Sequence, residues 1–303
     1  FTIVLRKDGT VWSFGSNTNG ELGLGDRGIY KNASEIKGLT DVVKISAGSK
    51  HTVVLNKYGE VYVWGYNNKG QLGTGDTKSV DVPTKLDLGG QDIIDVCAGK
   101  ENTILITSEG RLIVYGEKTG ISGAESVRNA VKVQSGDKLL VLTEDGNVQE
   151  VGDSVNAIYS AGDAVEIAVK GGNNLILTKT GKVYAYGANT NGELGLGNNS
   201  AVTTPTLVPI DKDVIDIGCG INNTYIITKD GLVYGSGKNT YTSIGNENEK
   251  DTNTYTLVGK QDFEIKPDNK VLSTNDEMTF EIKAERFNVF RKDERAITDF
   301  TWK

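Results

Sequence analysis

Few side chains in this sequence have the types and spacing that catalysis requires. His51 is the only histidine among 303 residues, so a nucleophile activated by an imidazole base would have to use it. It begins a β-branched run, at a strand position that other repeats of the chain fill with asparagine or phenylalanine. We therefore predict that His51 is a structural residue and that the chain is not an enzyme.

Two other motifs resemble binding sites only in part. Residues 235–239 read Gly-Ser-Gly-Lys-Asn, but a phosphate-binding loop requires serine or threonine where Asn239 stands, and no helix is predicted to follow. Asp211, Asp213 and Asp216 offer the hard oxygen ligands that suit Ca²⁺, yet the central glycine and final glutamate of a calcium loop are missing. We predict neither a cofactor nor a metal site.

The remaining reactive side chains select no site by their spacing. Cys97 and Cys219 lack the C-x-x-C spacing of zinc or redox motifs, so we expect them to be small buried thiols. The 40 Asp and Glu residues leave open a spatial pair for glycoside hydrolysis, but no pair stands out in the sequence.

Composition excludes several classes of protein. The chain has 38 glycines but only 4 prolines and no Gly-x-y period, which excludes collagen and proline-rich linkers. Its formal net charge is −7 and no block of lysine and arginine is present, so we predict no nucleic-acid partner. No apolar run approaches the ~20 residues of a membrane-spanning helix, so we predict no membrane insertion.

A glycine, a short strand and a second glycine six residues later recur along the chain. The six copies are residues 9–15, 59–65, 110–116, 146–152, 181–187 and 231–237. Their first glycines are 50, 51, 36, 35 and 50 residues apart, which is in the range of β-propeller blades. Since no segment has a sustained helical periodicity, the predicted class is all-β.

Each copy is predicted to contain a β-hairpin. A β-branched run leads into a Lys-Asp-Gly-like turn, where glycine takes positive φ at low cost, and a second strand follows. Aromatic residues two apart in that second strand share one face, as Trp12 does with Phe14 and Tyr62 with Trp64. We expect Trp12, Trp64 and Tyr186 to be structural residues, with Trp64 packed between blades.

A single blade cannot bury both of its faces, so consecutive blades must stack around an axis and close into a ring. The repeats predict six four-stranded blades within residues 1–265, although seven remain possible. The first copy begins abruptly at Phe1, without the lead-in strand of the other copies. We predict that Gln261–Ile265 supplies it by pairing with Phe1–Leu5, which removes two exposed sheet edges.

The segments after three aromatic strands carry the most specific pattern. Residues 15–25, 65–75 and 187–197 all read Gly-x-Asn-x-x-Gly-(Glu/Gln)-Leu-Gly-x-Gly. This pattern resembles the repeat of the regulator of chromosome condensation family, and the resemblance covers residues 1–265. It implies a β-propeller whose faces bind proteins. We expect the following glycines to be structural, as turns or points of close approach: Gly15, Gly23, Gly65, Gly73, Gly187 and Gly195.

The family includes a nucleotide-exchange factor for a small GTPase, ubiquitin-ligase modules and bacterial surface proteins. This acidic chain has no equivalent of the basic segments of the exchange factor, and no β-wedge motif matches it. The third and fourth copies also lack the Gly-x-Leu-Gly loop, and residues 116–128 and 152–162 are short substitutes. This thin sector of the ring either accepts a partner domain or reflects decay of the repeat.

Residues 266–303 depart from the repeat. The alternating pattern of Glu277–Ala284 and the ending Phe-Thr-Trp resemble the opening third of a bacterial immunoglobulin-like domain. The segment is too short to bury a sandwich core, which usually takes ~100 residues. We therefore predict a partial sandwich and a natural protein that continues beyond Lys303.

Partner recognition in a propeller is expected in the variable loops between strands. The candidate partner-binding residues are Tyr30, Lys31, Asn32, Tyr66, Lys78 and Asp81. We predict a non-catalytic, protein-binding propeller that is a monomeric module of a larger bacterial extracellular or cell-surface protein. A guanine-nucleotide exchange factor, and a propeller that cleaves or binds carbohydrate, are the alternatives.

Overall fold

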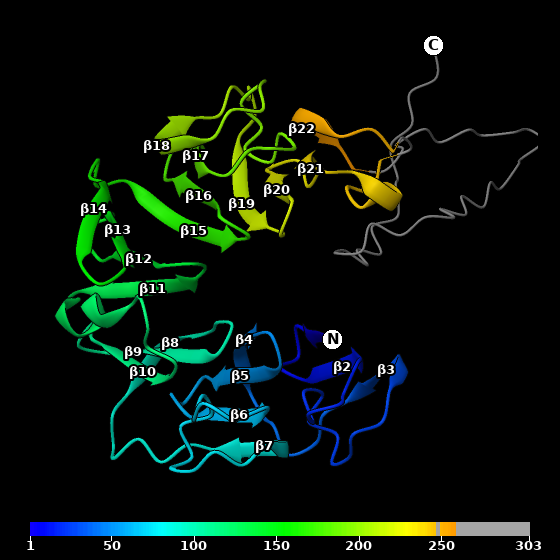
Figure 1. The fold of residues 1–303 in the computed structure, drawn as a ribbon, viewed down its shortest axis with the longest axis vertical. Helices are drawn as coiled ribbons and strands as arrows, with labels where there is room; N and C mark the ends of the chain where they lie inside the picture. The colour runs from blue at the N-terminus through cyan, green and yellow to red at the C-terminus, as the bar shows by residue number, and fades with distance from the viewer. Residues whose placement is uncertain (247–248, 259–303) are drawn as a thin grey trace, which may run out of the picture.

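The computed structural model describes residues 1–246 and 249–258 as an all-β propeller. Six antiparallel sheets follow one another around a central axis, and each sheet is one blade (Figure 1). The blades run in chain order, so the first and the sixth lie on the same side of the ring. The predicted all-β class and the six blades are confirmed.

Four of the blades have four strands each. The second blade contains β4 (Val42–Ala47), β5 (His51–Asn56), β6 (Val61–Gly65) and β7 (Val80–Lys85). The fourth contains β11 (Ala130–Ser135), β12 (Leu139–Thr143), β13 (Val148–Val151) and β14 (Val155–Tyr159). The fifth contains β15 (Ala164–Lys170), β16 (Asn173–Thr178), β17 (Val183–Gly187) and β18 (Val202–Leu207). The sixth contains β19 (Val214–Cys219), β20 (Asn223–Thr228), β21 (Val233–Gly237) and β22 (Thr252–Leu257), with the short helix η2 (Thr240–Thr242) after β21.

The other two blades have three strands among the described residues. The first contains β1 (Thr2–Leu5), β2 (Val11–Gly15) and β3 (Tyr30–Glu35), and the third contains β8 (Ile93–Ala98), β9 (Asn102–Thr107) and β10 (Leu112–Gly116). In the third blade, the chain after β10 forms the 3-10 helix η1 (Ser122–Ser126), which packs against β10 and β14. The short substitute in the third copy therefore replaces the outer strand.

The first blade begins with a strand that corresponds to the second strand of the other blades. β1 pairs with β2 and packs beside β4, the innermost strand of the second blade. The predicted closing strand Gln261–Ile265 lies outside the described residues, as does the immunoglobulin-like segment 266–303.

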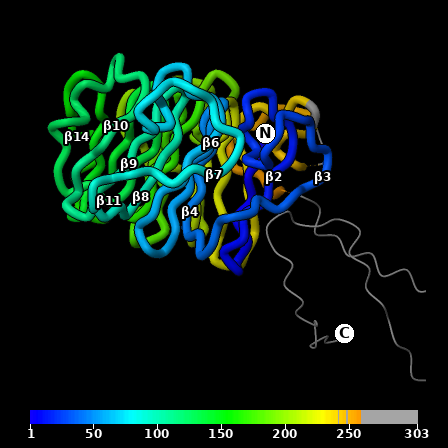
Figure 2. Tube along the Cα trace, turned by 90° about the horizontal axis from the view of Figure 1, so that it is seen from below, coloured from blue at the N-terminus to red at the C-terminus, as the bar shows by residue number. Residues whose placement is uncertain are grey.

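The ring has two faces that differ in their connections (Figure 2). On the turn face, the predicted hairpins turn at glycines with φ between 70° and 83°, namely Gly9, Gly59, Gly110, Gly146, Gly181 and Gly231. The residue before each innermost strand accepts a hydrogen bond from this turn, as Asp41 does from the Lys57 amide at 2.9 Å. The opposite face, which we call the loop face, carries the segments that follow the aromatic strands.

The core lies between neighbouring blades. Trp64 is fully buried against Val11 and Ile36 of the first blade and Val42 and Val54 of its own blade. Large aromatic side chains bury the most apolar area per residue, so this position dominates its interface.

Charged residues line the axis of the ring, where the innermost strands β4, β8, β11, β15 and β19 contact one another in turn. Lys44 pairs with Asp95, and Lys132 pairs with Glu166, so each ion pair joins two neighbouring innermost strands. Asp216 shares with both lysines and Glu166 a cavity of about 350 Å³, and burial raises the pKa of its carboxyl. The axis therefore contains a cavity lined in part by charged side chains.

Candidate functional site

Buried asparagines organise the long segments of the loop face. The Asn67 side chain accepts a hydrogen bond from the Leu72 amide at 2.9 Å and donates to the Asp76 carbonyl at 3.0 Å. Asn17 and Asn189 act in the same way in the first and fifth blades. In the sixth blade, Asn239 accepts from the Ile244 amide but donates to the Asn246 side chain. The glycines of this pattern were predicted as structural residues, but the asparagines were not. The asparagines could have been found because each follows the first glycine of its loop by two residues.

Each long loop packs on the next blade. A Cβ atom at Gly23 would lie 2.8 Å from the Trp64 ring nitrogen, so only glycine allows this close approach. The Trp64 Nε1 donates to the Glu21 carbonyl at 2.8 Å, and the Thr52 hydroxyl donates to the same oxygen at 3.0 Å. The first blade's loop is thus fixed by two donors from the second blade.

The same contact recurs at two further interfaces. Cβ atoms at Gly73 and Gly195 would lie within 2.8 Å of the rings of Tyr115 and Tyr255 respectively. On β10, Tyr115 occupies the position that corresponds to Trp64 on β6, whereas on β21 that position is Ser236. Tyr255 on the outer strand β22 therefore supplies the ring at the interface between the fifth and sixth blades.

His51 lies in the core. It is fully buried, and its Nε2 is 3.0 Å from the hydroxyl of Thr103 on the third blade. Burial lowers the pKa of His51 to about 4, so the ring is neutral at pH 7. A Cβ atom at Gly48 would lie 2.5 Å from the ring. The position serves close packing between two blades.

The other predicted structural residues occupy strand ends and strand interiors. Gly15, Gly65 and Gly187 end β2, β6 and β17 with φ of 107°, 104° and 119°. Tyr186 is only 3% exposed in the core between the fourth and fifth blades. Trp12 differs, because it is half-buried and lies 5.8 Å beneath the Arg6 guanidinium.

Three predicted partner-binding residues lie on the outer strand of the first blade. The Tyr30 hydroxyl donates to the Asp26 carboxylate at 2.5 Å, which lowers the pKa of that carboxyl. Lys31 and Asn32 are exposed on β3. Tyr30 is thus held by its own loop, while its two neighbours face outward.

Two predicted partner-binding residues on the second blade have different surroundings. Lys78 is exposed. Asp81 is half-buried against the first blade's loop, where its carbonyl accepts a hydrogen bond from the Gly25 amide at 2.9 Å. A Cβ atom at Gly20 would lie 2.7 Å from the Asp81 side chain. Asp81 therefore joins two blades.

Tyr66, the sixth predicted residue, lies beside a lysine on the loop face. The Lys50 ammonium lies 5.3 Å from the centre of the Tyr66 ring, and the Tyr66 amide donates to the Lys50 carbonyl at 2.8 Å. We call Lys50 and Tyr66 the Tyr66 patch. Farther along the same loop, Lys69 forms an ion pair of 3.5 Å with Glu117 of the third blade.

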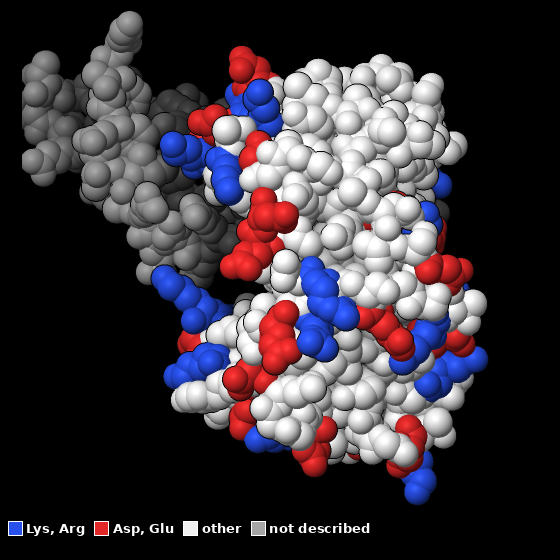
Figure 3. Space-filling view, turned by 90° about the vertical axis from the view of Figure 1, so that its left-hand side faces the viewer, with Lys and Arg blue, Asp and Glu red and all other residues white. Residues whose placement is uncertain are grey.

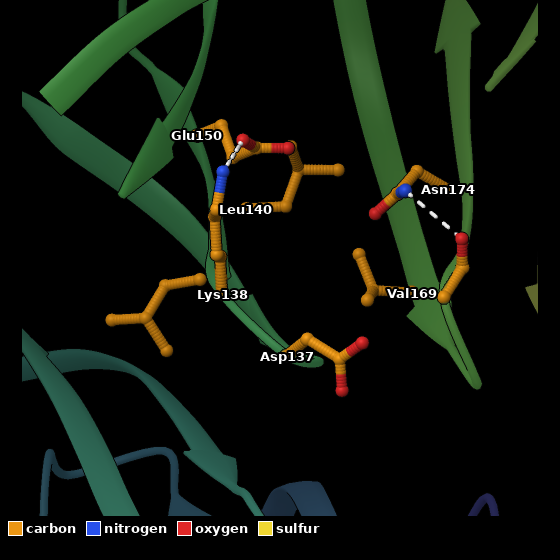
Figure 4. Close-up of a pocket in the computed structure, with 8 residues that line it drawn as sticks. Asp137, Lys138, Leu140, Glu150, Val169 and Asn174 are labelled. Carbon is orange, nitrogen blue, oxygen red and sulfur yellow. Dashed lines mark hydrogen bonds and ion pairs between the residues drawn. The ribbon is translucent and has the colours of Figure 1, made fainter. Parts of the chain in front are cut away.

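A pocket of about 200 Å³ lies between the fourth and fifth blades on the loop face (Figure 4). Asp137, Lys138 and Glu150 come from the fourth blade, and Val169 and Asn174 come from the fifth. Lys138 and Glu150 form an ion pair. The pocket lies in the thin sector predicted from the sequence.

Charges of both signs are mixed over the outer surface. On the side of the fourth blade, acidic and basic side chains are interspersed over the lower part and along the upper left edge, and the upper right part has few (Figure 3). In the described part of the chain, no group of three or more His, Cys, Asp or Glu residues is placed to hold a metal ion. Neither of its two helices is long and apolar enough to span a membrane.

Comparison with known proteins agrees with this architecture. The family model of the RCC1-like domain matches residues 1–293. The chain belongs to this family. The match extends past residue 265, where the repeats themselves indicate the end of the propeller.

Relatives and solved structures share the propeller but little of the sequence. The ultraviolet-B receptor UVR8 of Arabidopsis thaliana is 27% identical over 227 residues, which are 72% of this chain and 46% of UVR8. A protein RCC2 homolog of Danio rerio is 27% identical, over 72% of this chain and 47% of its own length. The chain thus spans about half the length of these relatives. Yeast RCC1 (Prp20) bound to Kap60 superposes with a TM-score of 0.73 at 19% identity, over 86% of this chain and 73% of Prp20, which shows the fold alone.

Proposed function

We propose that this propeller is a non-catalytic module that binds a protein partner through its loop face. Yeast Prp20 has been solved bound to Kap60, and a second Prp20 structure was described together with its binding to Gsp1p and histones. These partners belong to Prp20, and they support the general role of the fold as a protein-binding surface.

The Tyr66 patch carries the proposal. Among the described residues, neither the Tyr66 hydroxyl nor the Lys50 ammonium has a hydrogen-bond or ion-pair partner beyond the ring contact. A half-buried tyrosine held by its backbone loses little conformational entropy on binding, and tyrosine is enriched among residues that dominate interfaces.

The turn face offers a matched comparison. Lys57 lies 5.0 Å from the ring centre of its neighbour Tyr58, so the same two side-chain types meet there. Both already contact Asp41, through Lys57 Nζ at 2.8 Å and the Tyr58 hydroxyl at 3.3 Å. Their polar groups are satisfied within the chain, and those of Lys50 and Tyr66 remain available to a partner.

Selection from a phage-displayed library of random peptides on the full chain tests the proposal. We expect one consensus peptide whose affinity falls at least tenfold in Tyr66→Ala and Lys50→Ala. The control variants Tyr58→Ala and Lys57→Ala should bind it unchanged. Equal loss in both pairs, or no consensus, would reject the loop face as the binding surface.

Because the chain shares the fold of Prp20, the alternative of a nucleotide-exchange factor should be tested directly. If the full chain accelerates nucleotide release from purified small GTPases, the non-catalytic proposal is wrong.

We also propose that the module works, as a monomer, within a longer protein outside a bacterial cell, which its acidic composition supports. Protease digestion of intact cells should then remove the chain.

A further inference from the structure

The interface between the fourth and fifth blades lacks the loop that other interfaces contain. After β2, the first blade sends a long segment across to the second, where Thr52 and Trp64 hold the Glu21 carbonyl. After β13, the fourth blade instead turns at residues 152–154 directly into β14. Within residues 1–246 and 249–258, no loop therefore crosses to the fifth blade at this position.

The fifth blade nevertheless keeps a pair of donors in the same positions. Asn174 pairs with Tyr186 in the β16–β17 register just as Thr52 pairs with Trp64 in the β5–β6 register. Asn174 replaces the threonine hydroxyl with an amide, and Tyr186 replaces the indole N–H with a hydroxyl. Both can donate to a carbonyl oxygen.

Neither donor has a strong partner among the described residues. The Tyr186 hydroxyl is buried and makes no hydrogen bond of ordinary geometry, but the Glu150 carboxylate, which lines the pocket, lies close enough to raise its pKa together with burial. The Asn174 amide reaches only carbonyls of its own blade, at 3.3 Å and 3.5 Å. A buried donor without a well-placed acceptor is unfavourable, so a group that accepts from it gains affinity.

The pocket beside these donors combines apolar walls with a charged rim. Leu140 lines it from the fourth blade and Val169 from the neighbouring fifth blade, and Lys138 and Glu150 form their ion pair at its edge (Figure 4). Its volume of about 200 Å³ is below the ~300–1,000 Å³ of typical small-molecule sites, which favours one side chain on a turn of backbone over a cofactor.

We propose that this pocket, which we call the open interface, binds a loop of a partner protein that has the form Gly-(Glu/Gln)-Leu-Gly. The leucine of that loop fills the space between Leu140 and Val169. The carbonyl before the leucine takes the place of the Glu150 carboxylate beside Tyr186 and accepts hydrogen bonds from Tyr186 and Asn174. The partner thereby supplies the loop that the fourth blade lacks, and the inference rests on the proposed function because it names one site and one ligand type for protein binding.

The chain's own loops are poor candidates for this role. Leu22, Leu72 and Leu194 are fully buried in their own interfaces, so a second copy would have to open a blade contact to donate one. We therefore assign the occupant to a different protein.

A peptide that copies residues 17–25, Asn-Thr-Asn-Gly-Glu-Leu-Gly-Leu-Gly, is the probe. We expect a fluorescein-labelled copy to bind the full chain, and a copy with aspartate in place of its first leucine to bind at least tenfold more weakly. The double variant Asn174→Ala/Tyr186→Phe, which removes both donors, should weaken binding of the probe about tenfold. Equal affinity of the two peptides would overturn the proposal.

A grafted chain provides the complementary test. Replacing Asp153 and Ser154 by residues 16–29 gives the fourth blade a loop of its own, which should abolish probe binding. Unchanged probe binding in a folded graft would contradict the proposal, and if the graft fails to fold, the double variant still decides. Self-association of the full chain that the double variant abolishes would place a second copy in the pocket and also overturn it.

The two proposals fail separately. If library peptides still require Tyr66 but the probe does not bind, only the open interface is wrong. If the probe binds as expected but variants of the Tyr66 patch change nothing, the loop face still binds protein, at the open interface.

Discussion

The interface between the first and second blades and that between the fourth and fifth share a buried aromatic core but differ in what covers it. Trp64 is fully buried beneath a loop and has its ring nitrogen satisfied. Tyr186 is 3% exposed with no loop above it, and its hydroxyl has no partner among the described residues. Two blades can thus pack together without a loop between them, and where the loop is present it adds hydrogen bonds to the buried ring.

The largest effect should come from removing the covered ring. Trp64→Ala should lower the free energy of unfolding by about 3–5 kcal/mol, because it empties a fully buried site between two blades. Urea denaturation measures this loss, with Trp12→Ala as the control at a half-buried aromatic position. A loss below about 1 kcal/mol would place Trp64 outside the stabilising core.

The loop itself should contribute the next effect. Asn67→Ala should cost about 2–3 kcal/mol, since it leaves the buried Leu72 amide and the Asp76 carbonyl without their partner. The neighbouring exposed residue gives the matched control, Asn68→Ala, which should change stability by less than about 0.5 kcal/mol. Similar losses in both would mean that the loop is not held by the buried amide.

Acidification should weaken the interface that contains His51. The folded protein holds this ring neutral, with a pKa of about 4, and the unfolded chain protonates it near 6.5. The stability that this provides is therefore complete above pH 6.5 and is lost as the pH falls toward 4. From pH 7.5 to 5 we expect a loss of about 2 kcal/mol that His51→Asn does not show. Parallel pH profiles of the two proteins would contradict this.

The smallest effect should come from the uncovered tyrosine. Tyr186→Phe should leave the free energy of unfolding unchanged or slightly raise it, because the hydroxyl that it removes is buried and makes no hydrogen bond of ordinary geometry. At a covered interface, Tyr255→Phe should cost about 1 kcal/mol, since that hydroxyl lies 2.8 Å from the Thr224 hydroxyl. Thermal unfolding of both variants decides the comparison. A larger loss in Tyr186→Phe would mean that the two interfaces are equally satisfied.

Much of this architecture follows from local sequence. The Asp-Gly-like turns, the alternation of strand residues and the repeated glycines each act within a few residues, so six blades could be predicted from them. The thin sector was also visible, because a missing Gly-x-Leu-Gly motif is itself a sequence feature. The replacement of an outer strand by η1 could not be predicted from the sequence, since it depends on packing against β10 and β14.

The contacts between blades were fixed only by the tertiary structure. Glu21 and Trp64 are 43 residues apart, and no local pattern specifies that the carbonyl of one accepts from the ring of the other. At the interface between the fifth and sixth blades, Tyr255 supplies the ring, because the position that corresponds to Trp64 is Ser236. The sequence by itself determined where strands and turns form, because those depend on neighbouring residues. Which donors meet a loop and which lie beside an open pocket depends on how neighbouring blades pack around the axis, which brings together residues far apart in the chain.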